Sequence, residues 1–161
     1  MTVSEFNKCI DDYSDSVYRF ILKNCKDENI AKDIVQDSFE KFWLKKNDIL
    51  KGKEKSYLFT VAYHTFIDYK RKEKEIKKLN EIEEKNYCDT NQYNDIQEQL
   101  HKALDLLPEI QKSVLLLRDY EGYSYQEIAE ITLLNESQVK VYIFRARKFL
   151  QQYIGSIEQL L

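Results

Sequence analysis

Four cationic side chains stand close together in the last third of the 161-residue sequence. Lys140, Arg145, Arg147 and Lys148 lie within residues 137–150, a stretch without an acidic residue. Lysine and arginine bind phosphate groups, so this stretch could contact the backbone of a nucleic acid. The other interpretation is a solvated basic face on a helical bundle, and charge and periodicity alone divide evenly between the two.

Two capping motifs flank the start of this basic stretch. Ser124 and Glu127 have the spacing of a capping box, and Asn135 and Gln138 repeat that spacing further along. The boxes predict a short helix, a tight turn and a longer basic helix, which is the layout of a helix-turn-helix. Ala129 is small enough to let the two helices approach closely. The two boxes therefore favour DNA binding over a solvated bundle.

Aromatic and basic side chains mix in a second segment, residues 53–74. Tyr57, Tyr63 and His64 offer ring faces, and Phe66 is assigned to the core. The cations of the segment are Lys53, Lys55, Lys70, Arg71, Lys72 and Lys74. Aromatic faces stack on unpaired bases, at about 1–3 kcal/mol per base, while cations hold the strand. This segment could therefore stabilise a melted DNA strand, although core packing is the competing role for its rings.

Between the N-terminus and residue 53, one predicted helix carries a polar, acidic face. Asp33, Gln36, Asp37 and Glu40 are spaced three, one and three residues apart, so they share one face of a helix. The opposite face is apolar and carries Ile34, Val35, Phe39 and Trp43. Composition alone favours an ordinary solvated face here.

Catalytic and metal chemistry find little support in the sequence. The only histidines, His64 and His101, are far apart, and no phosphate-binding glycine loop is present. Cys9, Cys25 and Cys88 have neither metal-site nor disulfide spacing, so they are expected to be reduced thiols. We expect a protein that is not an enzyme and has no metal and no cofactor.

Composition predicts an all-α fold made of two small helical domains joined by an acidic linker. The chain has only 3 Gly and 1 Pro beside 33% charged residues, which leaves few tight turns for strands. Helical periodicity runs through residues 1–78, fades over residues 79–95 and returns over residues 96–161. Asp27 and Ser56 are expected to be the N-caps of two helices, and Gly122 is expected to be a C-cap.

The sequence also predicts a soluble, cytoplasmic protein. Its N-terminal residues lack the apolar core of a signal peptide, and no apolar run is long enough to span a bilayer. The formal net charge is −3, with basic patches on an otherwise acidic chain. Charge distribution matters more than its sum for nucleic-acid binding.

The C-terminal segment resembles region 4 of extracytoplasmic-function (ECF) sigma factors. The resemblance rests on residues 106–109 (LLPE), residues 116–131, Val139-Lys140 and residues 145–147. It implies binding to the −35 promoter element through the long basic helix. The residues assigned to this role are Ser137, Gln138, Lys140, Val141, Tyr142, Phe144, Arg145, Arg147 and Lys148. Leu133 stands where the family usually has glycine, so the turn is expected to differ.

Two upstream segments resemble region 2 of the same family. Residues 31–43 are similar to region 2.2, which implies docking of Asp33, Gln36, Asp37 and Glu40 on the clamp helices of the polymerase β′ subunit. Residues 57–72 are similar to regions 2.3 and 2.4, which implies recognition and melting of the −10 element. The residues assigned there are Lys53, Lys55, Tyr57, Tyr63, His64, Lys70, Arg71 and Lys74. Tyr57 replaces the usual Trp, and Tyr63-His64 replaces an Arg-Asn pair.

The resemblance implies a sigma factor that brings core RNA polymerase to promoters. Its expected partners are core RNA polymerase (β′ clamp helices and β flap), double-stranded promoter DNA, the melted −10 strand and an anti-sigma factor, without membrane insertion. The alternative is a stand-alone helix-turn-helix regulator with an N-terminal helical interaction domain. The first seventy-five residues discriminate, because a receiver domain would alternate strands with helices.

Overall fold

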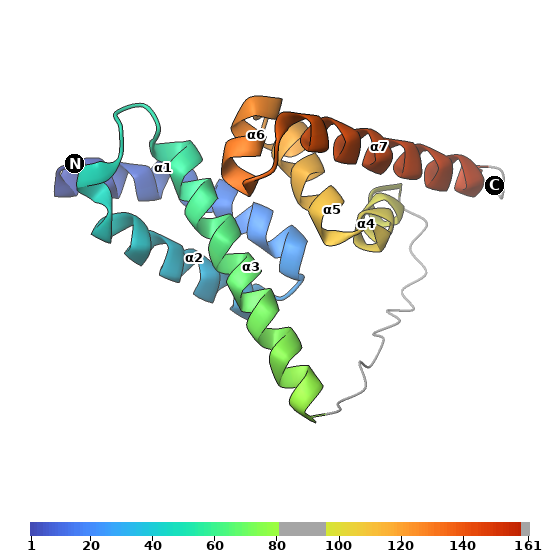
Figure 1. Cartoon of the computed structure of the whole chain (residues 1–161), viewed down its shortest axis with the longest axis horizontal. Helices are drawn as coiled ribbons and strands as arrows, with labels where there is room; N and C mark the ends of the chain where they lie inside the picture. Colours follow the sequence, from blue (N-terminus) through green and yellow to red (C-terminus); the bar gives the residue numbers. More distant parts are fainter. Residues whose placement is uncertain (81–95, 159–161) are drawn as a thin grey trace.

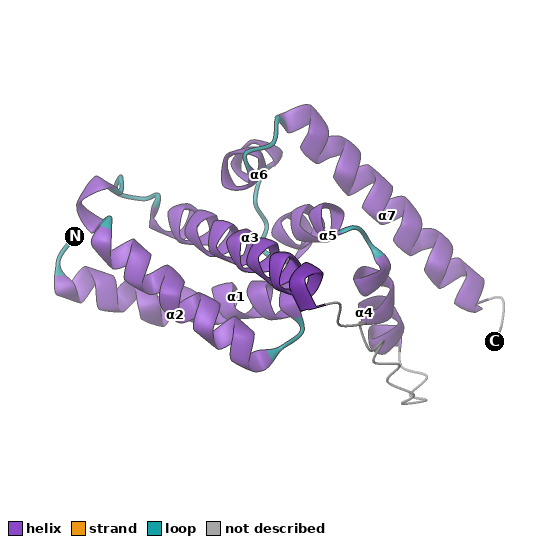
Figure 2. Cartoon of the chain, turned by 60° about the horizontal axis from the view of Figure 1, so that its bottom comes forward, coloured by secondary structure: helices purple, strands orange, loops and turns teal. Residues whose placement is uncertain are grey.

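The computed structural model describes residues 1–80 and 96–158, and every regular element in these two ranges is helical (Figures 1 and 2). We call them the N-terminal half and the C-terminal half. The N-terminal half contains α1 (Val3–Cys25), α2 (Glu28–Leu44), the 3-10 turn η1 (Lys46–Asp48) and α3 (Glu54–Asn80). The C-terminal half contains α4 (Ile96–Leu106), α5 (Glu109–Leu115), the π-helical turn η2 (Leu116–Tyr120), α6 (Tyr125–Thr132) and α7 (Glu136–Glu158). The all-α prediction is confirmed for these residues, whereas most of the predicted acidic linker lies outside them.

An aromatic core holds α1, α2 and α3 together. Phe20 of α1, Phe42 of α2 and both Phe59 and Phe66 of α3 are almost completely buried. The ring of Phe42 lies 5.9 Å from that of Phe6 in a tilted arrangement. Burying rings of this size is a large share of the free energy that holds a small domain together. The assignment of Phe66 to the core is confirmed.

The N-terminus of α2 follows the sequence prediction, and that of α3 does not. The carboxylate of Asp27 accepts hydrogen bonds from the backbone amides of Asn29 and Ile30 at 2.9 and 3.1 Å. Ser56, the predicted cap of α3, lies inside the helix, where its hydroxyl donates to the carbonyl of Lys53 at 3.2 Å. Gly52, with a φ of +89°, turns the chain earlier, and its amide donates to a carboxylate oxygen of Glu54. The prediction of Ser56 as the cap was wrong for this reason.

Both predicted capping boxes of the C-terminal half are present. The hydroxyl of Ser124 accepts from the amide of Glu127 at 3.1 Å, and the Glu127 carboxylate accepts from the Ser124 amide at 3.4 Å. The side chains of Asn135 and Gln138 make the matching exchange at 2.8 and 3.1 Å. These bonds satisfy amides that a helix start leaves unpaired. The short α6 and the long α7 are thereby fixed by local sequence.

The chain leaves α5 through a widened turn. In η2 the amide of Glu121 donates to the carbonyl of Leu116 at 3.2 Å, which is a π-type bond five residues back. Gly122 follows with a φ of +75°, the left-handed conformation that glycine adopts without strain. Gly122 therefore ends the helix as its position in the sequence predicts.

Leu133 adopts the left-handed conformation between α6 and α7, with φ 60° and ψ 26°. The turn keeps the backbone shape that suits glycine, so the expectation of a different turn was wrong. The Leu133 side chain is 78% exposed and gains little from packing. A left-handed conformation costs a residue with a Cβ roughly 1–2 kcal/mol. The capping box at Asn135 and the packing of α6 on α7 hold Leu133 in place against this cost.

Replacing Leu133 with glycine is therefore expected to raise the free energy of unfolding by about 1 kcal/mol, because the backbone strain disappears and almost no packing is lost. Urea denaturation followed by circular dichroism measures the change. Leu133→Ala is the matched control, since it shortens the side chain but keeps the Cβ and should give no gain. Equal stability of the glycine and alanine variants would contradict the assignment of strain.

Candidate nucleic-acid interface

One face of α7 is core and the opposite face is open to solvent. Val139, Ile143 and Ala146 are buried against the rest of the C-terminal half. The residues of the predicted −35 set that are exposed are Ser137, Gln138, Lys140, Val141, Phe144, Arg145, Arg147 and Lys148, while Tyr142 is half-buried. Val141 is 44% exposed and Phe144 is 68% exposed. The structure thus brings the predicted set onto the outer surface of one helix, with apolar side chains among cations.

Gln138 and Arg147, both members of the predicted −35 set, already have partners within the protein. Gln138 closes the capping box of α7. Arg147 forms an ion pair with Asp119 of η2, with Nη2 and Oδ1 2.6 Å apart, and this pairing raises the pKa of the guanidinium. Arg147 thus ties the π-turn to α7. The capping box at Gln138 was predicted from the sequence, whereas the Asp119 partner of Arg147 has no signature in the spacing of α7.

The remaining cations of α7 differ in how freely they can meet DNA. The ammonium of Lys140 lies 3.6 Å from the carboxylate of Glu136 one turn earlier. Arg145 and Lys148 are exposed, and the structure shows no ion pair for either within residues 1–80 and 96–158. Arg145 and Lys148 are therefore the side chains of this face best able to bind phosphates.

The predicted stacking rings of α3 differ in exposure. Tyr63 is only 5% exposed, and burial together with the Glu109 carboxylate raises the pKa of its hydroxyl. The expectation of an open ring face at Tyr63 is not met in this arrangement, because α5 begins with Glu109 beside it. Tyr57 and His64 are half-buried, and the His64 ring contacts the Tyr63 ring edge-to-face at 5.3 Å.

The cations of the same segment also differ in exposure. Lys53, Arg71 and Lys74 are exposed, and Arg71 pairs with Asp68 at 3.3 Å. Lys70 is half-buried and lies 3.6 Å from the Glu109 carboxylate. Lys53, just before α3, and Lys74, toward its far end, are exposed and show no ion pair within residues 1–80 and 96–158. Figure 1 shows the far end of α3 reaching beyond the other helices.

The predicted acidic face lies on the outside of α2. Asp33, Gln36 and Glu40 are exposed, and the opposite side of the helix buries Ile34 and Phe39. Asp37, the fourth member of the predicted set, is half-buried and pairs with Lys41 at 3.2 Å. The face thus keeps a net negative charge that faces solvent.

An apolar groove beside this face was not predicted from the sequence. It has a volume of about 790 Å³ between α1 and α2, and Gln36 and Glu40 of the acidic face are among its lining residues. Its apolar lining consists of Val3, Phe6, Ile10, Phe39, Trp43 and Leu44. In the sequence, the signal for this groove was Leu44, an apolar residue at the end of α2. The structure leaves its side chain 79% exposed.

The described residues contain no cluster of three or more potential metal ligands. Within those same ranges, no helix has the length and apolarity that crossing a bilayer requires. Cys9 and Cys25 are free thiols, and burial raises the pKa of each, which keeps them protonated. Cys88 lies outside the described residues.

Both halves of the chain match known protein families. Residues 9–76 match the Sigma-70 region 2 family and residues 97–150 match the Sigma-70, region 4 family. The RNA polymerase sigma factor SigV of Bacillus subtilis is 35% identical over 89% of this chain and 87% of its own length. The ECF RNA polymerase sigma factor SigM of the same organism is 30% identical over 94% of each chain.

Solved structures agree with these matches. The sigma factor RpoE from Bartonella quintana, crystallised with the anti-sigma factor NepR, superposes with a TM-score of 0.80 and 25% identity, over 95% of this chain and 98% of its own. CnrH, solved with the cytosolic domain of CnrY, gives a TM-score of 0.69 at 18% identity over 96% of this chain and 90% of its own, which supports the fold.

The fold and the two matched regions define a transcription initiation factor with a helix-turn-helix at one end. The chain belongs to the ECF group of the sigma-70 family. As a sigma factor it binds core RNA polymerase and directs it to promoters. The stand-alone regulator considered above is not supported, because residues 9–76 match sigma region 2.

Proposed function

We propose that this sigma factor contacts a promoter at two points and the polymerase at two more. The outer face of α7 reads the −35 element, and α3 with the loop before it recognises and melts the −10 element. The acidic face of α2 docks on the β′ clamp helices, and the C-terminal half also meets the β flap. The protein works in the cytoplasm, needs no cofactor and supplies promoter specificity without a catalytic group of its own.

The observation that carries this proposal is the outer face of α7. Val141 and Phe144 are apolar and open to solvent, and they stand among the exposed cations Arg145 and Lys148. Core packing does not explain apolar side chains on this side, because the buried stripe of α7 lies opposite. Cations on phosphates beside apolar contacts to thymine methyl groups would use both kinds of side chain.

An anti-sigma partner is a further part of the proposal. RpoE was crystallised with the anti-sigma factor NepR, and RpoE aligns with 95% of this chain. The apolar groove between α1 and α2 adds a surface that a regulator could cover. We propose that such a regulator holds this chain away from polymerase until it is needed.

In vitro transcription tests the proposed function. The full chain is mixed with core RNA polymerase and a library of genomic fragments, and transcripts are sequenced. We expect transcripts whose start sites share a common pair of upstream elements, absent when the chain is omitted. Transcripts without a shared upstream element would contradict promoter recognition by this chain.

Replacing Phe144 with alanine is expected to weaken binding of the holoenzyme to a promoter from that library by about 1 kcal/mol, or roughly fivefold. The fold should be unaffected, because the ring is 68% exposed. Fluorescence anisotropy with labelled promoter DNA measures the affinity. Leu106→Ala is the control, since Leu106 is also exposed but lies on α4. Equal losses of promoter affinity in both variants would show that Phe144 does not contact the DNA.

A further inference from the structure

A small basic pocket opens where α1, α4, α5 and η2 meet. It has a volume of about 300 Å³, at the lower end of the range for small-molecule sites. None of its lining residues is assigned above to the −35 element, the −10 element or the clamp helices. Its apolar lining consists of Leu22, Leu104 and Leu116, and its polar lining consists of Arg19, Lys23, Lys26, His101, Asp105 and Lys112. We call it the cationic pocket.

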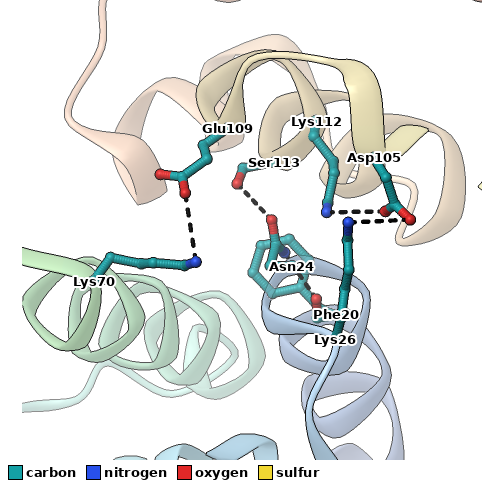
Figure 3. A network of polar contacts seen from close by, with 8 residues as sticks. All are labelled: Phe20, Asn24, Lys26, Lys70, Asp105, Glu109, Lys112 and Ser113. Atoms are coloured by element: carbon teal, nitrogen blue, oxygen red, sulfur yellow. Dashed lines mark hydrogen bonds and ion pairs between the residues drawn. The ribbon is translucent and has the colours of Figure 1, made fainter. Parts of the chain in front are cut away.

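The helices that carry the lysines of this pocket are fixed against one another by a buried hydrogen bond. The Ser113 hydroxyl of α5 donates to Oδ1 of Asn24 of α1 at 2.8 Å (Figure 3). The amide nitrogen of Asn24 donates in turn to the Phe20 carbonyl at 2.8 Å, so the amide is held in one orientation. Lys112 directly precedes Ser113, and Lys26 follows Asn24 by two residues. The backbone beneath both lysines is therefore held in place before a ligand arrives, which lowers the entropy cost of binding.

Lys26 and Lys112 share a single carboxylate at the pocket. The ammonium of Lys26 lies 3.1 Å from one oxygen of Asp105, and that of Lys112 lies 3.4 Å from the other (Figure 3). The Lys112 side chain is only 8% exposed, so little water surrounds its charge. Burial lowers the pKa of Lys112; Asp105 opposes this effect and the Lys26 ammonium adds to it. A single carboxylate therefore leaves one positive charge of this pair in excess.

Arg19 and Lys23 bring two more positive charges from the preceding turns of α1. The Arg19 guanidinium pairs with Glu121 at 3.1 Å, and the Lys23 ammonium lies 3.3 Å from the centre of the Tyr120 ring. Burial lowers the pKa of Lys23, and repulsion by Arg19 adds to this effect. Within the described residues, the cluster thus combines four cations with the two carboxylates Asp105 and Glu121, and it carries two excess positive charges.

We propose that the cationic pocket binds a small organic phosphate that carries two negative charges. Lysine ammonium groups bind phosphate oxygens as point charges, and a dianion matches the two excess charges of the cluster. The three leucines of the lining would pack against the carbon skeleton of the ligand. This site is separate from the surfaces proposed for DNA and the clamp helices, so the inference goes beyond the proposed function and does not depend on it.

Isothermal titration calorimetry of the full chain with inorganic pyrophosphate, in chloride buffer at constant ionic strength, tests the pocket. We expect saturable binding to one site per chain. Lys112→Met should weaken it about tenfold, because a buried charged donor is lost while the side-chain length is kept. Lys26→Met should also weaken binding and leaves the fold intact, because the Lys26 side chain is 52% exposed. Lys32→Met on α2 is the matched control, since Lys32 is exposed outside the pocket.

Replacement of the shared carboxylate supplies an arm of opposite sign. Asp105→Asn should tighten pyrophosphate binding about tenfold, because the carboxylate that competes for both ammonium groups is gone. Asp11→Asn makes the same charge change at an exposed site of α1 and should keep the wild-type affinity. Unchanged affinity in Asp105→Asn would contradict binding at this pocket.

The chemical class of the ligand is tested on the wild-type chain with three further probes. Phenyl phosphate should bind more tightly than inorganic phosphate, because its ring reaches the leucines, and equal affinities would overturn an organic ligand. Tighter binding of an oligo-aspartate peptide than of pyrophosphate would overturn the proposal in favour of an acidic protein segment. The site itself is overturned by a lack of saturable pyrophosphate binding up to about 10 mM, or by equal affinities of the Lys112→Met, Lys26→Met and Lys32→Met variants.

Discussion

Replacing both Asp33 and Asp37 with arginine is expected to lower the affinity for core RNA polymerase by about a hundredfold. The exposed acidic face of α2 would then present two cations to the basic clamp helices, and reversed charges at an interface cost several kcal/mol. The fold should persist, because Asp33 is exposed and Asp37 is half-buried and pairs with Lys41 one turn later on the same helix. Co-purification with core polymerase and a titration of labelled sigma factor measure the loss.

The matched control for this double variant lies on α1. Asp11 and Asp15 are both exposed and have the same four-residue spacing as Asp33 and Asp37. Replacing them with arginine makes the same change in net charge away from the proposed docking face. The docking assignment fails when both double variants bind core polymerase equally well.

Replacing Arg145 and Lys148 with alanine is expected to weaken −35 binding about tenfold and to lower the salt dependence. Each cation that neutralises a phosphate adds roughly one to the slope of log K against log salt, so the slope should fall by about two. Both side chains are exposed, so unfolding is not the cause of the loss. Titration of promoter DNA with holoenzyme at several salt concentrations gives the slope.

Removal of two exposed lysines elsewhere controls for the change in net charge. Lys8 of α1 and Lys102 of α4 serve this purpose. Their double alanine variant should keep the wild-type slope, because neither lies on the outer face of α7. A slope that is unchanged in the Arg145 and Lys148 variant would place DNA on a different surface.

The features predicted well from the sequence are those that short segments determine. The capping boxes at Ser124 and Asn135 each need only four residues, and both are formed as expected. The buried stripe of α7 follows from helical spacing in the same way. The prediction of Ser56 as an N-cap was wrong because a competing turn at Gly52 begins α3 earlier. The sequence offered two plausible starts for this helix.

The features that were missed depend on contacts between distant segments. Tyr63 was expected to be open, and Glu109 of α5 approaches it only because the two halves pack together. The ion pair between Arg147 and Asp119 depends on how η2 meets α7. The Asn24–Ser113 bond likewise has no signature in either local segment. Side-chain types predict what a residue can do, whereas tertiary packing determines whether it is free to do it.

The contacts between the two halves set an order of events during protein synthesis. The contacts that α1, α2 and α3 make with one another lie within the first 80 residues, so this bundle can form as soon as they have left the ribosome. Glu121, which pairs with Arg19, emerges later, and ribosomes add roughly 5–20 residues per second. The nascent N-terminal half therefore spends seconds with α3 uncovered, and a cotranslational partner meets a surface that the finished chain conceals.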